Sequence, residues 1–164
     1  MPLLHPLRPD HAPALLAFER ENRAFFATTV PDRGDDYFAH FAARHRALLA
    51  EQAAGDCHFH LLLDDAGAVL GRVNLVDVAD GAAELGYRIA ERATGRGLAT
   101  RAVQAVCGLA ARDYGLTALR AATTLDNPAS QRVLTRAGFT TTGGTTLDGR
   151  PGLTYHRPLT DLLT

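Results

Sequence analysis

Lysine is absent from this 164-residue sequence, so all 17 of its basic residues are arginine. Because a P-loop closes on Gly-Lys-Ser/Thr, this absence argues against that kind of nucleoside-triphosphate chemistry. An excess of either charge is also missing, since 18 acidic residues oppose the arginines and the formal net charge is -1. A chain with this balance lacks the positive charge that draws a protein to nucleic acid or to an anionic membrane, so we expect neither partner.

Cysteine and long apolar runs are scarce as well. The two cysteines, Cys57 and Cys107, have no C-x-x-C spacing, and the sequence opens without a secretory leader, so we expect a reducing cytoplasm. No apolar run approaches the roughly 18 to 20 residues that cross a bilayer. With 46% hydrophobic residues, the chain has the size of one ordinary domain, 1–164, and can bury a core without disulfides or metal.

The hydrophobic periodicity predicts an α+β chain with the order βααβββαβαββ. Strands are expected at 3–7, 57–63, 69–78, 83–89, 116–125, 139–146 and 153–158, and helices at 14–25, 37–53, 97–113 and 128–137. Asp35 or Asp36 is expected to cap the second helix. The last helix has the sharpest limits, because Asn127 can cap it, Pro128 suits its first position and Gly138 ends it.

The stretch Arg92–Thr100, RATGRGLAT, places two glycines where a strand gives way to a helix. A dinucleotide fingerprint needs a third glycine or alanine where Thr100 stands and an acidic residue at the end of the next strand, which reads LRAATTL here, so that fit is poor. Consecutive N–H groups from Gly95 to Thr100 can instead hold an anion at the helix start, with Arg92 and Arg96 adding charge. The alternative is an ordinary turn with solvated arginines.

Segments on both sides of this loop carry a family resemblance. They are ELGYRI at 84–89, NPAS at 127–130 and RAGF at 136–139. Together with [Q/R]-x-x-G-x-[G/A] at Arg92, Gly95 and Gly97, they resemble the GNAT acyltransferases, in particular the RimJ/RimL type of ribosomal-protein N-terminal acetyltransferase. The resemblance is strong over 83–139 and weak before about residue 57.

This resemblance implies a three-layer fold, with helices on both faces of a mixed, mostly antiparallel sheet of about seven strands. It also implies acetyl-coenzyme A as co-substrate, no metal, and direct attack on the thioester by a primary amine of a protein N-terminus or a small molecule. The chain would be a monomer or a homodimer. The implied cofactor contacts lie in the loop, the preceding strand and the last helix: Tyr87, Arg88, Ile89, Arg92, Thr94, Gly95, Arg96, Gly97, Leu98, Ala99, Thr100, Asn127 and Ser130.

The resemblance also suggests which residues carry out the reaction steps. Backbone N–H groups at or near Arg88 and Ile89 would stabilise the oxyanion. The tyrosine that many relatives use to protonate the thiolate is Leu134 here, so Ser130 takes that role, with local capping as the alternative. Glu84 would accept the amine proton through water, with a solvated strand-edge glutamate as the alternative.

The acceptor side is expected from the first two helices and their loop, at Phe25, Phe26, 28–36 and Tyr37, with Tyr155 and His156 as further candidates. His58 and His60 share one face of a strand but lack a third metal ligand, so we expect sheet surface or pocket lining. Two rival functions remain: a non-catalytic sensor of acyl-coenzyme A, and an unrelated enzyme that binds ADP or NAD.

Overall fold

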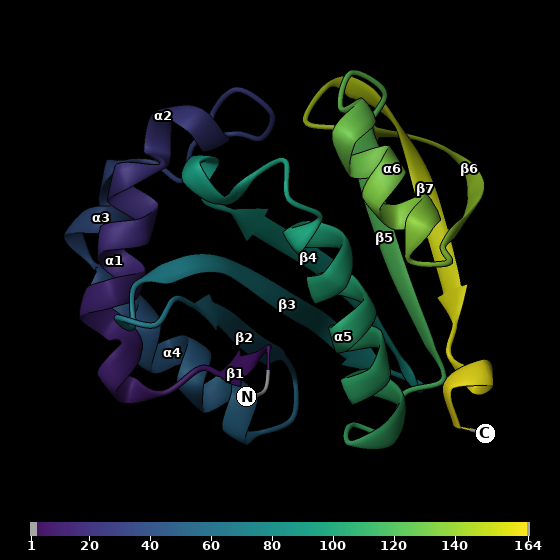
Figure 1. Ribbon diagram of the computed structural model, residues 1–164, viewed down its shortest axis with the longest axis horizontal. Coiled ribbons are helices and arrows are strands. Elements are labelled where there is room, and N and C mark those ends of the chain that lie inside the picture. Colours follow the sequence, from purple (N-terminus) through teal and green to yellow (C-terminus); the bar gives the residue numbers. More distant parts are fainter. Residues whose placement is uncertain (1–2, 164) are drawn as a thin grey trace.

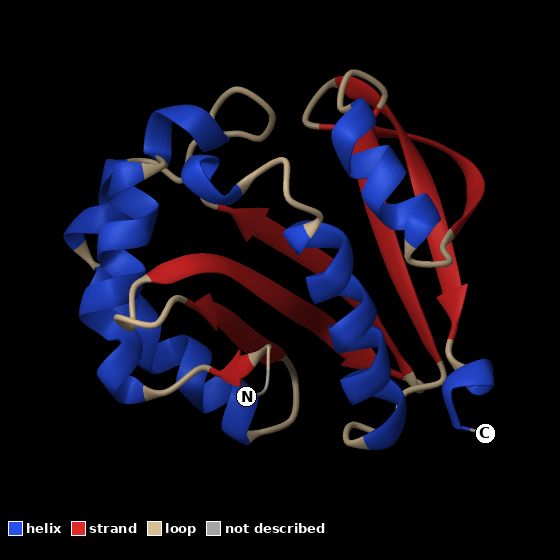
Figure 2. Ribbon diagram, in the orientation of Figure 1, coloured by secondary structure: helices blue, strands red, loops and turns tan. Residues whose placement is uncertain are grey.

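The computed structural model describes residues 3–163, and its centre is one seven-stranded sheet of order β1-β2-β3-β4-β5-β7-β6 (Figure 2). The strands are β1 (His5–Pro6), β2 (His58–Leu63), β3 (Val69–Ala79), β4 (Ala82–Ile89), β5 (Ala118–Thr124), β6 (Thr140–Leu147) and β7 (Arg150–Pro158). β4 and β5 pair in parallel, and every other neighbouring pair is antiparallel. The predicted mixed, mostly antiparallel sheet is therefore confirmed.

Helices cover both faces of this sheet (Figure 1). They are α1 (Ala12–Glu21), α2 (Arg23–Phe26), α3 (Asp35–Ala39), α4 (Phe41–Ala53), α5 (Leu98–Arg112) and α6 (Pro128–Arg136), with 3₁₀ turns η1 (Pro9–His11), η2 (Glu91–Ala93) and η3 (Thr160–Leu163). Glu19 of α1 contacts Arg88, whereas Ser130 of α6 contacts Tyr87. Because neighbouring strand residues point to opposite faces, α1 and α6 lie on opposite sides of the sheet. Within residues 3–163, no helix has the length and apolarity of a membrane span.

The core forms between the sheet and the apolar faces of the helices that pack on it. On α5, Ala102, Val106 and Ala110 recur at four-residue intervals and are fully buried against the sheet. On the opposite face, Leu15 and Phe18 of α1 are buried in the same way. These two helices pack on the central strands: α1 contacts β3, and α5 contacts β3 and β4.

Both predicted N-terminal helices are broken in the structure. Asn22, with φ of -105°, separates α1 from α2. Its side-chain amide donates to the Phe18 carbonyl, and its Oδ1 accepts from the Glu91 N–H, each at 2.9 Å. The second predicted helix is interrupted at His40, whose φ of -114° is not helical. Asn22 thus ties the first helical segment to η2, just after β4.

The two predicted helix caps had different outcomes. Asp35 and Asp36 do not cap α3, so that prediction was wrong: the N-cap is Gly34, and the carboxylates sit in the first turn, where the helix dipole favours negative charge. Asn127 does cap α6, because its Oδ1 accepts from the Ser130 N–H at 3.3 Å and Pro128 opens the helix. The prediction for α6 is confirmed.

Candidate active site

The sheet opens in its middle, between β4 and β5. These strands pair only at Ala82–Ala118, Ala83–Leu119 and Glu84–Arg120. Beyond that point β4 remains paired with β3 up to Ile89, and β5 with β7 up to Thr124, so the two strands diverge while each keeps its other neighbour (Figure 1). The divergence exposes the backbone edges of both strands to a cavity.

This cavity has a volume of about 740 Å³ and extends from one face of the sheet to the other. Its lining comes from the diverging parts of β4 and β5, the start of α5, one side of α6, and the segment that includes α2 and the residues after it, such as Phe26, Thr29 and Pro31. The segments that approach one another here are far apart in the sequence. The cavity is therefore a product of the fold rather than of any one segment.

The glycine loop forms one end of the cavity. Gly95 and Gly97 have φ of 77° and 72°, a left-handed conformation that favours glycine. A Cβ added at either residue would meet no other described atom within 4 Å. Gly97 is the N-cap of α5, no side chain of the described residues caps this helix, and the first intrahelical bond runs from Arg101 N–H to the Gly97 carbonyl. The amides of Leu98–Thr100 lack intrahelical partners, as at any helix start, which fits a phosphate.

Arginines approach the cavity from places that the sequence interpretation did not consider. Of the three arginines expected to contact the cofactor, Arg88 lines the cavity, whereas Arg92 and Arg96 do not. Arg92 lies 3.5 Å from Asp64, and Arg96 donates to the Arg92 carbonyl. Arg132 and Arg136 of α6 line it instead, together with Arg150. The helical spacing of residues 129, 132, 133 and 136 is the signal that would have identified this face of α6.

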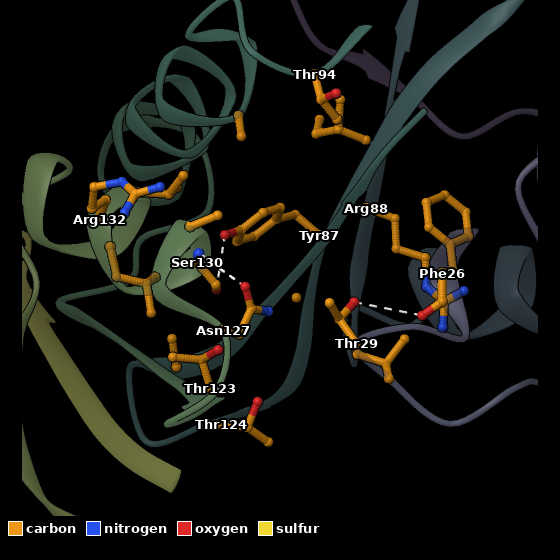
Figure 3. A pocket seen from close by; sticks show the side chains of 18 of the residues that line it. Phe26, Thr29, Tyr87, Arg88, Thr94, Thr123, Thr124, Asn127, Ser130 and Arg132 are labelled. Atoms are coloured by element: carbon orange, nitrogen blue, oxygen red, sulfur yellow. Dashed lines mark hydrogen bonds between the residues drawn. The ribbon is translucent and has the colours of Figure 1, made fainter. Parts of the chain in front are cut away.

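Tyr87 and Ser130 join the two walls of the cavity. The Tyr87 hydroxyl donates a hydrogen bond to Ser130 Oγ at 2.9 Å, as Figure 3 shows, while Asn127 Oδ1 accepts a hydrogen bond from the Ser130 N–H. Burial raises the pKa of Tyr87, so this hydroxyl keeps its proton at neutral pH. The Ser130 hydroxyl faces Tyr87 across the cavity, whereas Asn127 performs the local capping.

Glu84 lies outside the cavity lining, at the last residue where β4 pairs with β5. It shares a face of β4 with Gly86 and Arg88, both of which line the cavity. A Cβ added at Gly86 would meet no other described atom within 4 Å. An unobstructed strip of the strand thus separates Glu84 from the cavity.

The fold brings most of the expected cofactor residues to this one cavity. Those that line it are Tyr87, Arg88, Ile89, Thr94, Gly95, Gly97, Leu98, Ala99, Thr100, Asn127 and Ser130. Of the residues expected on the acceptor side, Phe25, Phe26, Thr29, Val30 and Pro31 line it too, whereas Thr28 and residues 32–36 do not. Tyr37 does not: it is buried, and Arg72 approaches its hydroxyl at 3.4 Å. Tyr155 and His156 on β7 also lie outside the lining.

Neither histidine of the pair lines the cavity, and the prediction of sheet surface or pocket lining was wrong for His60, whereas His58 stays partly exposed. His60 is fully buried, with Nδ1 3.0 Å from the Val73 carbonyl and Nε2 2.5 Å from the Tyr114 hydroxyl, and His58 stacks on the Tyr114 ring. Tyr114, just after α5, covers this face of β2 and makes the pair part of the packing. In the part of the chain that the structure describes, no group of three or more His, Cys, Asp or Glu side chains could hold a metal ion.

The sheet thus opens between two parallel strands into an elongated cavity, with a glycine loop and a helix start at one end and the α2 segment at the other. A model of the acetyltransferase (GNAT) domain family matches residues 3–140. The chain therefore belongs to the GNAT acetyltransferase family.

Individual relatives agree with this assignment. The chain is 29% identical over 142 residues to the probable N-acetyltransferase YjcK of Bacillus subtilis, covering 83% of this chain and 78% of that protein. The ribosomal-protein-S5-alanine acetyltransferase of Vibrio fischeri has the same fold, with a TM-score of 0.91, 18% identity, and coverage of 97% and 93%. RimJ of Mycobacterium smegmatis, solved with a coenzyme A disulfide, has a TM-score of 0.86, 22% identity, and coverage of 98% and 83%. The RimJ/RimL type of fold expected from the sequence is thus confirmed.

Proposed function

We propose that this GNAT acetyltransferase moves an acetyl group from acetyl-coenzyme A to a primary amine, on a protein N-terminus or a small molecule. The observation that carries this proposal is the continuity of one cavity from the glycine loop, through the gap between β4 and β5, to the α2 segment. A cofactor can enter from the loop end and an acceptor from the α2 end. Both reactants then meet beside β4.

The residues at the loop end fit the cofactor's charge. The first amides of α5 and the positive end of the helix dipole favour the diphosphate, and Arg132 and Arg136 add positive charge along α6. When bound, acetyl-coenzyme A supplies an activated acyl group as a thioester. We assign the exposed edges of β4 and β5 to its pantetheine arm, because unpaired strand edges offer amide donors and acceptors.

The free edge of β4 also suits the oxyanion. The Ala90 N–H bonds to the Leu70 carbonyl of β3 at 2.8 Å, and N–H directions alternate along a strand. The Ile89 N–H therefore points to the opposite edge, which faces the gap. We propose that it stabilises the negative charge that develops on the acetyl oxygen.

Ser130 is our candidate for protonating the leaving thiolate. Its hydroxyl lies on the cavity wall and receives a hydrogen bond from the Tyr87 hydroxyl. As Ser130 gives up its proton, this bond would stabilise the oxygen that remains and allow Tyr87 to return a proton. The pair would then work as one donor.

Glu84 is our candidate for receiving the amine proton through water. It lies two residues, or about 7 Å, from Gly86 along β4, too far for direct contact with an amine in the cavity. A water has room beside Gly86. Asn74, the register partner of Gly86, has a buried Oδ1 without a hydrogen-bond partner among the described residues, and such an atom is usually satisfied by water.

The test is a calorimetric titration with acetyl-coenzyme A, beside ADP and NAD at the same salt, followed by thiol-release assays with amines and N-terminal peptides. We expect tight binding of acetyl-coenzyme A and thiol release with a subset of the amines. Binding without thiol release from any amine would favour the sensor function. Equal binding of ADP or NAD would indicate that the cavity does not select acetyl-coenzyme A and would overturn the proposal.

A further inference from the structure

A cluster of three arginines surrounds one carboxylate behind the α2 end of the cavity. Glu19 of α1 is 1% exposed, and its Oε2 lies 3.0 Å from both Arg33 Nε and Arg72 Nη1. Its Oε1 lies 3.4 Å from Arg88 Nη1. Three guanidinium groups thus share a single carboxylate, so the charges of these four side chains do not cancel and the cluster is net positive.

The cluster also has hydrogen-bonding capacity to spare. Buried arginines normally have their donors satisfied, because an unmet buried donor is costly. Here Nε of Arg72, on a side chain that is 4% exposed, has no acceptor among the described residues. Arg33 Nε is also buried without one, because its N–H is not directed at Glu19 despite the short distance. Additional acceptor oxygens would satisfy this site.

Arg88 connects the cluster to the cavity. It is the register partner of Arg72, so both side chains lie on the α1 face of the sheet. Figure 3 shows Arg88 leaving β4 on the side opposite Tyr87 and running beside Phe26, whose ring centroid is 4.9 Å from its Cζ. The hydrogen bond from Arg88 to Glu19 is long, at 3.4 Å. Burial together with the nearby charge of Arg33 lowers the pKa of Arg88 to about 10, so this side chain remains charged at neutral pH.

Neighbouring carboxylates do not neutralise this end of the cavity. Asp32 and Asp35 both bind Arg23, at 2.8 and 2.9 Å, and the Asp35 side chain is 95% exposed. Among the described residues that line the cavity, Asp148 is the single acid, and it comes from the turn between β6 and β7 on the β5 side. The acceptor end therefore presents Arg88 without an opposing acidic wall.

Building on the acetyl transfer proposed above, we infer that Arg88, supported by Arg33, binds a carboxylate of the acceptor, so that the acceptor is an amine that also carries a carboxylate. Bidentate pairing with a carboxylate is what a guanidinium favours. The carboxylate can be the α-carboxylate of a free amino acid or an acidic side chain next to an N-terminal amine. A polycationic amine such as spermidine would be repelled.

The first experiment compares matched acceptors by kcat/KM for thiol release. One arm uses free amino acids against their amides, and the other uses N-terminal peptides with Asp against Asn at the second position. In the arm that contains the natural kind of acceptor, kcat/KM of the carboxylate compound should be about tenfold to hundredfold higher than that of its neutral partner. This is the range expected for a charge-assisted hydrogen bond. Spermidine should be poorer than either.

Variants test whether Arg88 binds the carboxylate of the acceptor. In Arg88→Gln the ratio between carboxylate and neutral acceptors should collapse to about one, whereas Arg88→Lys should keep part of it. Arg33→Gln should lower the ratio less. Arg46→Gln, on an exposed part of α4, is the matched control and should keep the wild-type ratio. A calorimetric titration of the carboxylate acceptor into protein saturated with coenzyme A measures binding without transfer.

The outcomes separate this inference from the function on which it rests. Thiol release with equal kcat/KM for carboxylate and amide acceptors would overturn the inference and leave the acetyl transfer standing. If no amine releases thiol, the acetyl transfer is overturned, and the titration still tests the carboxylate site. Binding that is lost in Arg88→Gln would support that site, and no binding to the wild-type protein would overturn it.

Discussion

The substitution Gly97→Asp tests the glycine loop most directly. Gly97 caps α5 with φ of 72° and ψ of 10°, and a side chain added there would meet nothing within 4 Å. The fold should therefore survive, at the expense of about 1–2 kcal/mol for placing an L-residue in the left-handed region. For a chain of this length, that corresponds to a fall in Tm of about 2–8 °C.

The effect on binding should be much larger than the effect on stability. An aspartate at residue 97 would put a negative charge in front of the α5 amides. Two charges about 4 Å apart interact by about 1 kcal/mol in water and about 4 kcal/mol at an effective dielectric constant of 20. Because the loop is exposed, we take about 1–2 kcal/mol for each of two phosphates, which predicts a loss of acetyl-coenzyme A affinity of about thirtyfold to a thousandfold.

Calorimetric titration and thermal unfolding of the same samples provide the assay. Gly97→Ala separates the backbone effect from the charge, because it should lose a similar amount of stability and much less affinity. Gly67→Asp is the matched control: its φ is 85°, its surroundings are equally open, and it lies outside the cavity lining. Wild-type affinity in a folded Gly97→Asp protein would refute the assignment of this loop to the cofactor's phosphates.

Three further predictions concern single side chains. Ser130→Ala should lower kcat about hundredfold, as expected for loss of a general acid, while the dissociation constant for acetyl-coenzyme A stays near the wild-type value; unchanged thiol release would leave Ser130 with a structural role only. Glu84→Gln should flatten the rise of kcat/KM between neutral and alkaline pH, and an unaltered profile would indicate that bulk water takes the proton. Burial lowers the pKa of His60 to about 4, below its ordinary value of 6.5, so the unfolded chain binds this proton first and stability is lost as pH falls from about 6.5 towards 4. Between pH 7 and pH 5, denaturant unfolding should show a fall of about 2 kcal/mol that His60→Gln lacks, and equal falls in the two proteins would contradict the assignment.

Local chemistry allowed much of the fold to be predicted from sequence. The α6 limits followed from Asn127 and Pro128, because a cap and a fixed φ act on adjacent residues. The left-handed glycines of the loop followed from their place between a strand and a helix. The first two helices were mispredicted as unbroken. Asn22 leaves the helical conformation in the first and bonds with Glu91, which is 69 residues away, and His40 leaves it in the second.

The amino-acid sequence by itself determined the α+β class, the glycine loop between β4 and α5, and the family. These properties reside in short segments whose periodicity and glycine positions act locally. The tertiary structure alone decided where β4 and β5 part, that Tyr87 meets Ser130, and that Glu19 gathers Arg33, Arg72 and Arg88 at the acceptor end. Such contacts join residues tens of positions apart, and they form only when sheet register and helix packing bring the side chains onto one face.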